Sequence, residues 1–167
     1  SDKSIEYLEA YSALGAFYMN FQKLEEASSV FSRSLAIQSE VTGENNEFYA
    51  DTLASLGLIA TVQGKYDIGE SYLIKSLTIK EEISDKNKNN LITSYIGLGI
   101  LYMFINSYDK AEKYLNKYSM MARKEYGESS LGYADSINIM GDITKGTKSK
   151  ISFKIFLKFF VSMLFTK

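Results

Sequence analysis

Two pairs of adjacent carboxylates are the residues of this sequence that come nearest to a catalytic arrangement. They are Glu25-Glu26 and Glu81-Glu82. Two carboxyl groups that flank a bond can act together as a general acid and a general base. Neighbouring residues on a helix point about 100° apart, so neither pair can flank one substrate bond. We therefore interpret both pairs as solvated helix surface.

The composition excludes most other catalytic chemistry. The 167-residue chain contains no cysteine, histidine, proline or tryptophan. A disulfide, a thiolate nucleophile, an imidazole base and a Cys/His zinc site are therefore excluded. The glycines occur singly within helical patterns and do not cluster as a phosphate-binding loop does. We expect a protein that is not an enzyme and that needs no cofactor or metal.

Charge and size limit the partners of the chain. The length and the 46% apolar content suit one domain with a continuous core. From Lys145 onward there are six lysines and no acid, so residues 1–144 carry a net charge of −7 of the total of −1. An acidic body disfavours nucleic acid as the main partner. The absence of cysteine fits a reducing compartment, and we expect a cytoplasmic protein.

The elements that must position any functional side chain recur at a fixed interval. Leu14-Gly15, Leu56-Gly57, Leu98-Gly99 and Met140-Gly141 are each 42 residues apart. Three further columns keep this interval: Leu24, Tyr66, Tyr108; Ala27, Gly69, Ala111; and Phe31, Leu73, Leu115. The sequence therefore predicts four copies of one unit, at about residues 5–45, 46–87, 88–129 and 130–144 onward.

Each copy is expected to be a helical hairpin. In the first copy Tyr11, Leu14 and Tyr18 follow the spacing of one helix face, which predicts an amphipathic helix that we name helix A. After a short break a second apolar stripe starts at Leu24 and predicts helix B. A connection this short makes the two helices antiparallel neighbours.

The recurring glycine needs a physical reason, because glycine costs a helix about 1 kcal/mol relative to alanine. Without a Cβ atom, helix A can approach helix B closely at Gly15, Gly57 and Gly99. The small column on helix B permits the same approach from the other side. The bulky column at Phe31, Leu73 and Leu115 then fills the next gap.

This pattern resembles the tetratricopeptide repeat over roughly residues 5–144. The usual unit has about 34 residues, whereas the interval of 42 is similar to the kinesin light chain variety. The resemblance implies an all-α fold: a right-handed α-solenoid of antiparallel helix pairs, with three full repeats and a degenerate fourth. The Asn-Asn that this family places before the leucine is replaced by Ser12-Ala13 and its equivalents.

In such a solenoid the helices A line a concave surface, so the outer face of each helix A holds the candidate contacts to a ligand. These positions become more apolar toward the third repeat. The predicted groove residues are Glu9, Ser12, Ala16, Met19, Asn20, Asp51, Ala54, Leu58, Thr61, Val62, Ile96, Ile100, Met103 and Phe104.

An acidic edge runs beside this groove. Its column is Glu9, Asp51, Thr93 and Asp135, and Asp142 lies one turn deeper in the fourth copy. One interpretation is a site for basic residues of a peptide that is anchored by apolar side chains. The other is that acids in the first turn of a helix complement its dipole.

Residues 145–167 form a second segment of different composition, basic and strongly apolar. As a helix it would be apolar over most of its circumference and would need cover. It could be helix B of the fourth repeat, or it could lie in the concave groove of its own or a neighbouring chain. A membrane span is disfavoured, because about fifteen residues with two central lysines fall short of the roughly 20 that a span needs.

Two functional hypotheses follow. The first is a scaffold that binds a protein or peptide along the helices A, as an adaptor similar to kinesin light chain. The second is a structural assembly element, in which the apolar C-terminal helix docks on its own repeats or forms a homodimer with a neighbouring chain.

Overall fold

The computed structural model describes residues 2–83, 91–129 and 133–134. Within this part of the chain the regular elements are all α-helices: α1 Asp2–Asn20, α2 Leu24–Val41, α3 Glu47–Val62, α4 Tyr66–Ile83, α5 Ile92–Phe104 and α6 Tyr108–Tyr126. The predicted all-α class is confirmed. Helices α1, α3 and α5 are the helices A of the three repeats, and α2, α4 and α6 are the helices B.

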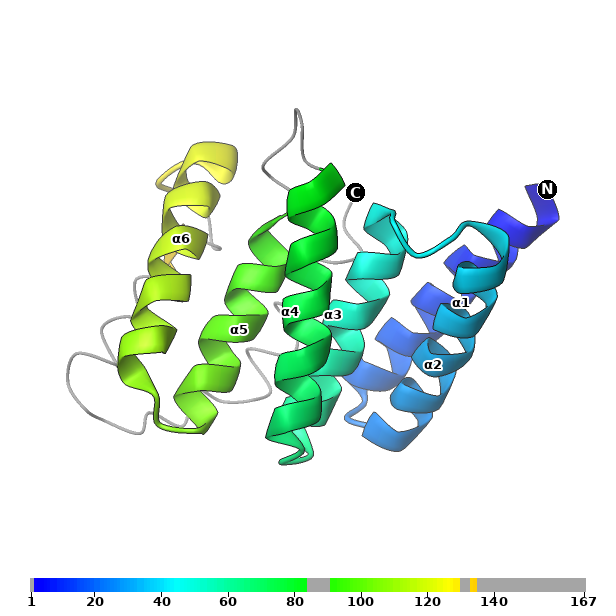
Figure 1. Cartoon of the computed structure of the whole chain (residues 1–167), viewed down its shortest axis with the longest axis horizontal. Coiled ribbons are helices and arrows are strands. Elements are labelled where there is room, and N and C mark those ends of the chain that lie inside the picture. The colour runs from blue at the N-terminus through cyan, green and yellow to red at the C-terminus, as the bar shows by residue number, and fades with distance from the viewer. Residues whose placement is uncertain (1, 84–90, 130–132, 135–167) are drawn as a thin grey trace.

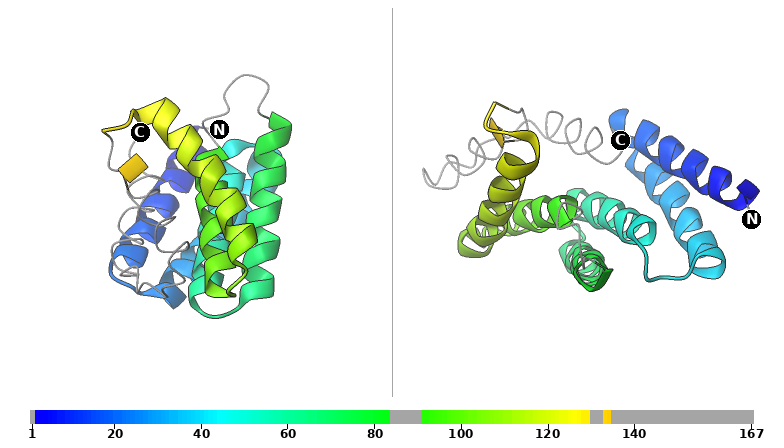
Figure 2. Two further views of the ribbon diagram at one scale, coloured as in Figure 1. Left: turned by 90° about the vertical axis from the view of Figure 1, so that its left-hand side faces the viewer. Right: turned by 90° about the horizontal axis from the view of Figure 1, so that it is seen from above.

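The six helices form two layers (Figure 1). Each helix A packs most extensively on the helix B that follows it, and α2 and α4 also pack on the helix A of the next repeat. Seen from above, α3 and α5 lie side by side behind α4, and α1 lies at one end of the stack (Figure 2). The predicted order of antiparallel hairpins is therefore present.

The glycine column lies between the paired helices, as the sequence predicts. A Cβ atom added at Gly15 would lie 2.5 Å from Phe31 Cζ, and one added at Gly99 would lie 2.6 Å from Leu115 Cδ2. At Gly57 the nearest atom would be Leu73 Cγ, at 2.7 Å. Real Cβ atoms do not approach heavy atoms this closely, so only glycine permits these contacts.

The small column on helix B is equally constrained in the second repeat. A Cβ atom at Gly69 would lie 2.9 Å from the carbonyl oxygen of Gly57 and 2.7 Å from Thr61 Oγ1. Here α3 and α4 meet backbone to backbone. In the first and third repeats the same position is alanine, at Ala27 and Ala111, and both alanines are fully buried.

The turn within each hairpin has one conformation in all three repeats. Its central residue has a positive φ of 58° at Gln22, 76° at Gly64 and 58° at Asn106. In each turn the next amide donates to a carbonyl five residues earlier, for example Lys23 N to Tyr18 O at 2.9 Å. This is the hydrogen bonding of a left-handed helix end, which favours glycine. Only Gly64 meets that preference.

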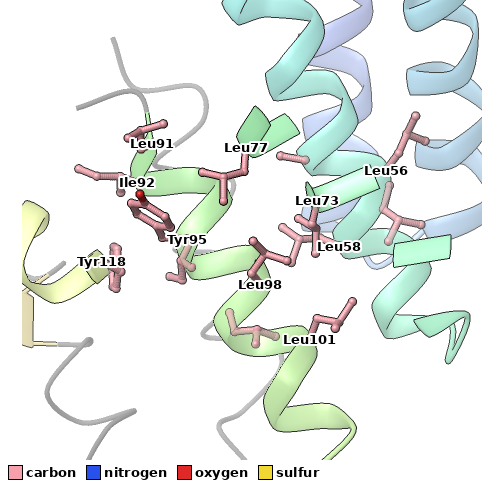
Figure 3. Packing of buried hydrophobic residues seen from close by; sticks show 14 of the residues in the cluster. Leu56, Leu58, Leu73, Leu77, Leu91, Ile92, Tyr95, Leu98, Leu101 and Tyr118 are labelled. Atoms are coloured by element: carbon pink, nitrogen blue, oxygen red, sulfur yellow. The ribbon is translucent and has the colours of Figure 1, made fainter. Parts of the chain in front are cut away.

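Successive repeats are joined by Leu73 and its neighbours. Besides facing Gly57, Leu73 would lie 2.5 Å from a Cβ atom at Gly97 of α5. Figure 3 shows buried side chains of α3, α4 and α5 meeting in this core, among them Leu58 and Leu98. One side chain therefore fills the space left by glycines of two repeats.

Polar groups also cross between repeats. Gln38 of α2 donates to Thr52 of α3 at 2.9 Å, and Ser76 of α4 shares a hydrogen bond of 2.9 Å with Ser94 of α5. All four side chains are buried. Because each polar contact needs one alignment of the helices, these pairs fix the register of one repeat on the next.

The structure differs from the sequence pattern at Leu14, which is 42% exposed although Leu56 and Leu98 of the same column are buried. The first repeat has no preceding repeat to cover it. The fourth repeat and the segment 145–167 lie outside the described residues, and so do the proposed positions Asp135 and Asp142. None of the described helices is long and apolar enough to cross a membrane.

Candidate protein-binding surface

The predicted groove residues fall into three classes of exposure. Those exposed to solvent are Glu9, Asn20 and Phe104. Those of intermediate exposure are Asp51, Val62 and Met103. Those that are buried are Ser12, Ala16, Met19, Ala54, Leu58, Thr61, Ile96 and Ile100. The accessible members therefore lie toward the ends of the helices A, and the middle of the face is covered.

The covered middle differs from the open groove floor that the sequence predicts. Leu58 and Ile96 are completely buried, and Ile100 is 5% exposed. All residues from Thr52 to Thr61 and from Leu91 to Tyr102 are buried, so α3 and α5 are enclosed on every side over these ranges. Enclosure suits their apolar composition, because a helix that is hydrophobic all round is stable only when buried.

Thr61 has a structural role inside the hairpin. Its hydroxyl donates to the carbonyl of Gly57 at 2.8 Å and lies against Gly69 of α4. Thr61 therefore belongs to the contact between α3 and α4. Its prediction as a ligand contact does not agree with this placement.

Asp51 has a partner within the chain. The ammonium group of Lys80 donates to Asp51 Oδ1 at 2.5 Å and also donates to Thr93 Oγ1. Lys80 is 1% exposed, whereas the Asp51 side chain is 28% exposed. A buried ammonium needs a counter-charge, and Asp51 supplies it. Neither interpretation of the acidic edge foresaw this, because Lys80 lies on helix B and its column reads Gln38, Lys80, Ala122.

The accessible rim lies where the helices A end. Phe104 is 44% exposed, and its ring centroid is 6.5 Å from that of Tyr66 on α4. Ile105, in the turn that follows, is 37% exposed. Together with Met103 and Val62 these residues offer apolar surface next to the buried floor. Glu9 is exposed at the other end of the first helix A.

Sequence reasoning missed a second series, on the helices B. Arg33, Lys75 and Lys117 are 42 residues apart, and each places its cation over a tyrosine ring, at 5.0 to 6.0 Å from the centroid. The rings are Tyr11, Tyr49 and Tyr95. Cations attract the face of an aromatic ring at such distances. The period of 42 in the basic residues was the signal that could have identified this series.

The third repeat extends this series into an aromatic cluster. The rings of Tyr102 and Tyr114 are stacked with centroids 5.6 Å apart, and Lys110 lies 4.9 Å above Tyr102. The Tyr102 hydroxyl donates to Glu70 of α4. Burial raises the pKa of the Tyr102 phenol well above its ordinary value, and the hydrogen bond to the Glu70 carboxylate raises it further. The cluster joins α4, α5 and α6.

This geometry offers helical surface for packing, with no grouping typical of a reactive centre. Among the described residues, no three acidic side chains gather in a way that could hold a metal ion. The stacked hairpins with a shared concave side define the class of α-helical repeat scaffolds.

Comparison with known proteins identifies the repeat. Residues 52–124 match the family model of the tetratricopeptide repeat. The chain therefore carries tetratricopeptide repeats, which confirms the resemblance seen in its sequence. This fold is a non-catalytic scaffold, and tetratricopeptide repeats generally mediate interactions between proteins.

A solved structure supports the same fold. The structure of BtubC (BKLC) from P. vanneervenii is similar to this chain, with a TM-score of 0.65 and 17% sequence identity. The match covers 90% of this chain and 63% of BtubC, so the chain spans less than two thirds of that protein. No curated protein matches the sequence.

Proposed function

We propose that the chain is a protein-interaction scaffold, similar in kind to kinesin light chain, which holds a partner peptide or helix along the concave side of α1, α3 and α5. We also infer a cytoplasmic location from the cysteine-free composition. The observation that carries the proposal is the apolar rim of Val62, Met103 and Phe104 beside the apolar floor of α3 and α5. Apolar side chains of a partner helix have a place to dock there.

The placement of charges narrows the partner. Asp51 is already paired with Lys80, so attraction for basic residues of a ligand rests on Glu9 and not on a continuous acidic edge. Affinity should therefore come mainly from apolar anchors. A ligand first meets Phe104 and Met103 at the rim, and it reaches Ile100 only if the face opens.

Phe104→Glu is the informative substitution. Phe104 is 44% exposed, so a carboxylate is tolerated there, whereas Ile100→Glu would bury a charge and threaten the fold. Peptides selected from a displayed library on the full chain would be measured by fluorescence anisotropy. Loss of a central aromatic contact should weaken binding by about 30-fold, equivalent to about 2 kcal/mol.

Met120→Glu is the matched control, because Met120 is 73% exposed on α6. Equal affinity of the Phe104→Glu variant and the parent chain would contradict the proposed groove. A selection that yields no peptide with apolar anchors would contradict it too.

The second candidate is self-assembly or self-docking through residues 145–167. The burial of Leu58 and Ile96 favours it, because an open groove would leave these side chains in water. Light scattering on the chain with and without residues 147–167 separates the two functions. Loss of a dimer on truncation supports assembly, and a monomer in both cases supports the adaptor.

A further inference from the structure

The outer face of α1 carries an apolar stripe that no described helix covers. We name the stripe the α1 face, and its residues are Tyr7, Ala10, Leu14, Phe17 and Phe21. Tyr7 is 66% exposed, Leu14 42%, Phe17 53% and Phe21 63%. The rings of Phe17 and Phe21 are in contact, with centroids 4.6 Å apart, so the apolar surface is continuous.

The equivalent positions in the next two repeats are buried against the preceding helix B. Thr52, which corresponds to Ala10, is bonded to Gln38 of α2, and Ser94 of the same column is bonded to Ser76 of α4. Ile59 and Leu101, which correspond to Phe17, are 1% and 0% exposed. The fold therefore shapes this side of a helix A to receive another helix. In Figures 1 and 2, α1 is the end of the stack on this side.

The side chains of the α1 face are chosen for contact with a protein and not with water. A repeat that ends a solenoid normally presents a polar outer face. Here the positions that carry threonine and serine in the second repeat, Thr52 and Ser55, become Ala10 and Ala13. The stripe also alternates steps of three and four residues, which is the spacing by which two helices pack side by side.

We propose that the α1 face is a dimer interface with a second copy of this chain, in which α1 packs on α1 about a two-fold axis. A two-fold contact uses the same patch on both copies, so the patch must complement itself. Large rings at Phe17 and Phe21 beside the small residues Ala10 and Ala13 provide both bulk and space. Among the described helices, each of the others exposes at most two large apolar side chains.

The size of the contact sets the expected strength. The stripe from Tyr7 to Phe21 runs for about 21 Å at 1.5 Å per residue. One pair of helices of this length is small beside a standard interface of about 1,600 Å². We therefore expect a reversible dimer, with a dissociation constant on the order of 10 μM, in place of a permanent one.

Light scattering and sedimentation of the full chain, from well below to well above that concentration, test the proposal. The parent chain should shift from monomer to dimer. Leu14→Glu with Phe17→Glu should raise the dissociation constant by more than about 100-fold, because two charges would be buried at the contact. Phe17→Ala, which keeps the helix, should raise it by about 10-fold. Met120→Glu, on α6, should dimerise like the parent chain.

Cross-linking locates the contact independently. Because the chain has no cysteine, Leu14→Cys introduces a single thiol, and a short bis-maleimide should join two chains. Met120→Cys should give no comparable product. A parent chain that stays monomeric throughout, or a dimer that survives both α1 variants, would overturn the proposal. Neither result bears on peptide binding at Phe104, so the groove and the dimer are tested separately.

Discussion

Gly69→Ala tests the close approach of α3 and α4. The same column holds Ala27 and Ala111 in the neighbouring repeats, so the repeat pattern alone favours alanine. Alanine would also improve the helix propensity by up to about 1 kcal/mol. From the sequence, the substitution should therefore stabilise the chain.

The structure predicts the opposite result. The new Cβ atom would lie 2.9 Å from the carbonyl oxygen of Gly57 and 2.7 Å from Thr61 Oγ1. A backbone carbonyl in a packed helix cannot move aside as a flexible side chain can, and such overpacking costs about 1–3 kcal/mol. After the gain in propensity, we expect a net loss of about 1 kcal/mol in the free energy of unfolding.

Urea unfolding followed by far-UV circular dichroism measures this difference, and Ala111→Gly is the control. In the third repeat the control should lose about 1 kcal/mol through propensity alone. Thr61→Ala removes one of the two clashing atoms, so Gly69→Ala should cost about 0.5 kcal/mol less in that background. A Gly69→Ala chain more stable than the parent by about 1 kcal/mol would refute the backbone contact.

Two further substitutions test other parts of the stack. Asp51→Ala should lower the free energy of unfolding by about 3 kcal/mol, because it leaves the buried ammonium of Lys80 without its counter-charge, whereas Lys80→Met should cost less than half as much, since the carboxylate that remains can be hydrated; urea unfolding of both variants would contradict this account if the order were reversed. Gln22→Gly should stabilise the chain by about 1 kcal/mol, and Asn106→Gly by less, because asparagine tolerates the left-handed conformation better than glutamine. Thermal melts of the two variants decide this, and a lower melting temperature for Gln22→Gly would argue against a left-handed turn.

Local spacing was sufficient to predict the hairpins. Gly15, Phe31 and their equivalents repeat at 42 residues because each repeat solves the same packing problem between its own two helices. Contacts within one hairpin are close in sequence, so a column of glycines opposite a column of bulky residues specifies them. The turns were equally legible, although Gln22 and Asn106 hid a conformation that only Gly64 announces.

Contacts between repeats could not be read in this way. Lys80 pairs with Asp51 across 29 residues, and no other repeat has a basic residue at its position. The column rule also treated every helix A as open on its outer face. The run from Leu91 to Tyr102 is apolar on all sides, and this composition already argued for enclosure. Exposure depends on what lies beside a helix, and spacing within the helix does not contain that information.

The same dependence on neighbours gives α1 its separate role. Leu14, Leu56 and Leu98 are chemically identical members of one column, and only Leu14 is exposed, because it stands at the end of the stack. An exposed end of a solenoid either becomes polar or acquires a partner. The α1 face is apolar over its whole length, and it points to a different side of the helix from Met19 and Ser12 of the groove, which lie two and five residues from Phe17 and are buried. A second copy on α1 and a ligand along the helices A can therefore be bound at the same time, so dimer formation would bring two grooves into one particle and raise the effective affinity for a partner with two docking segments.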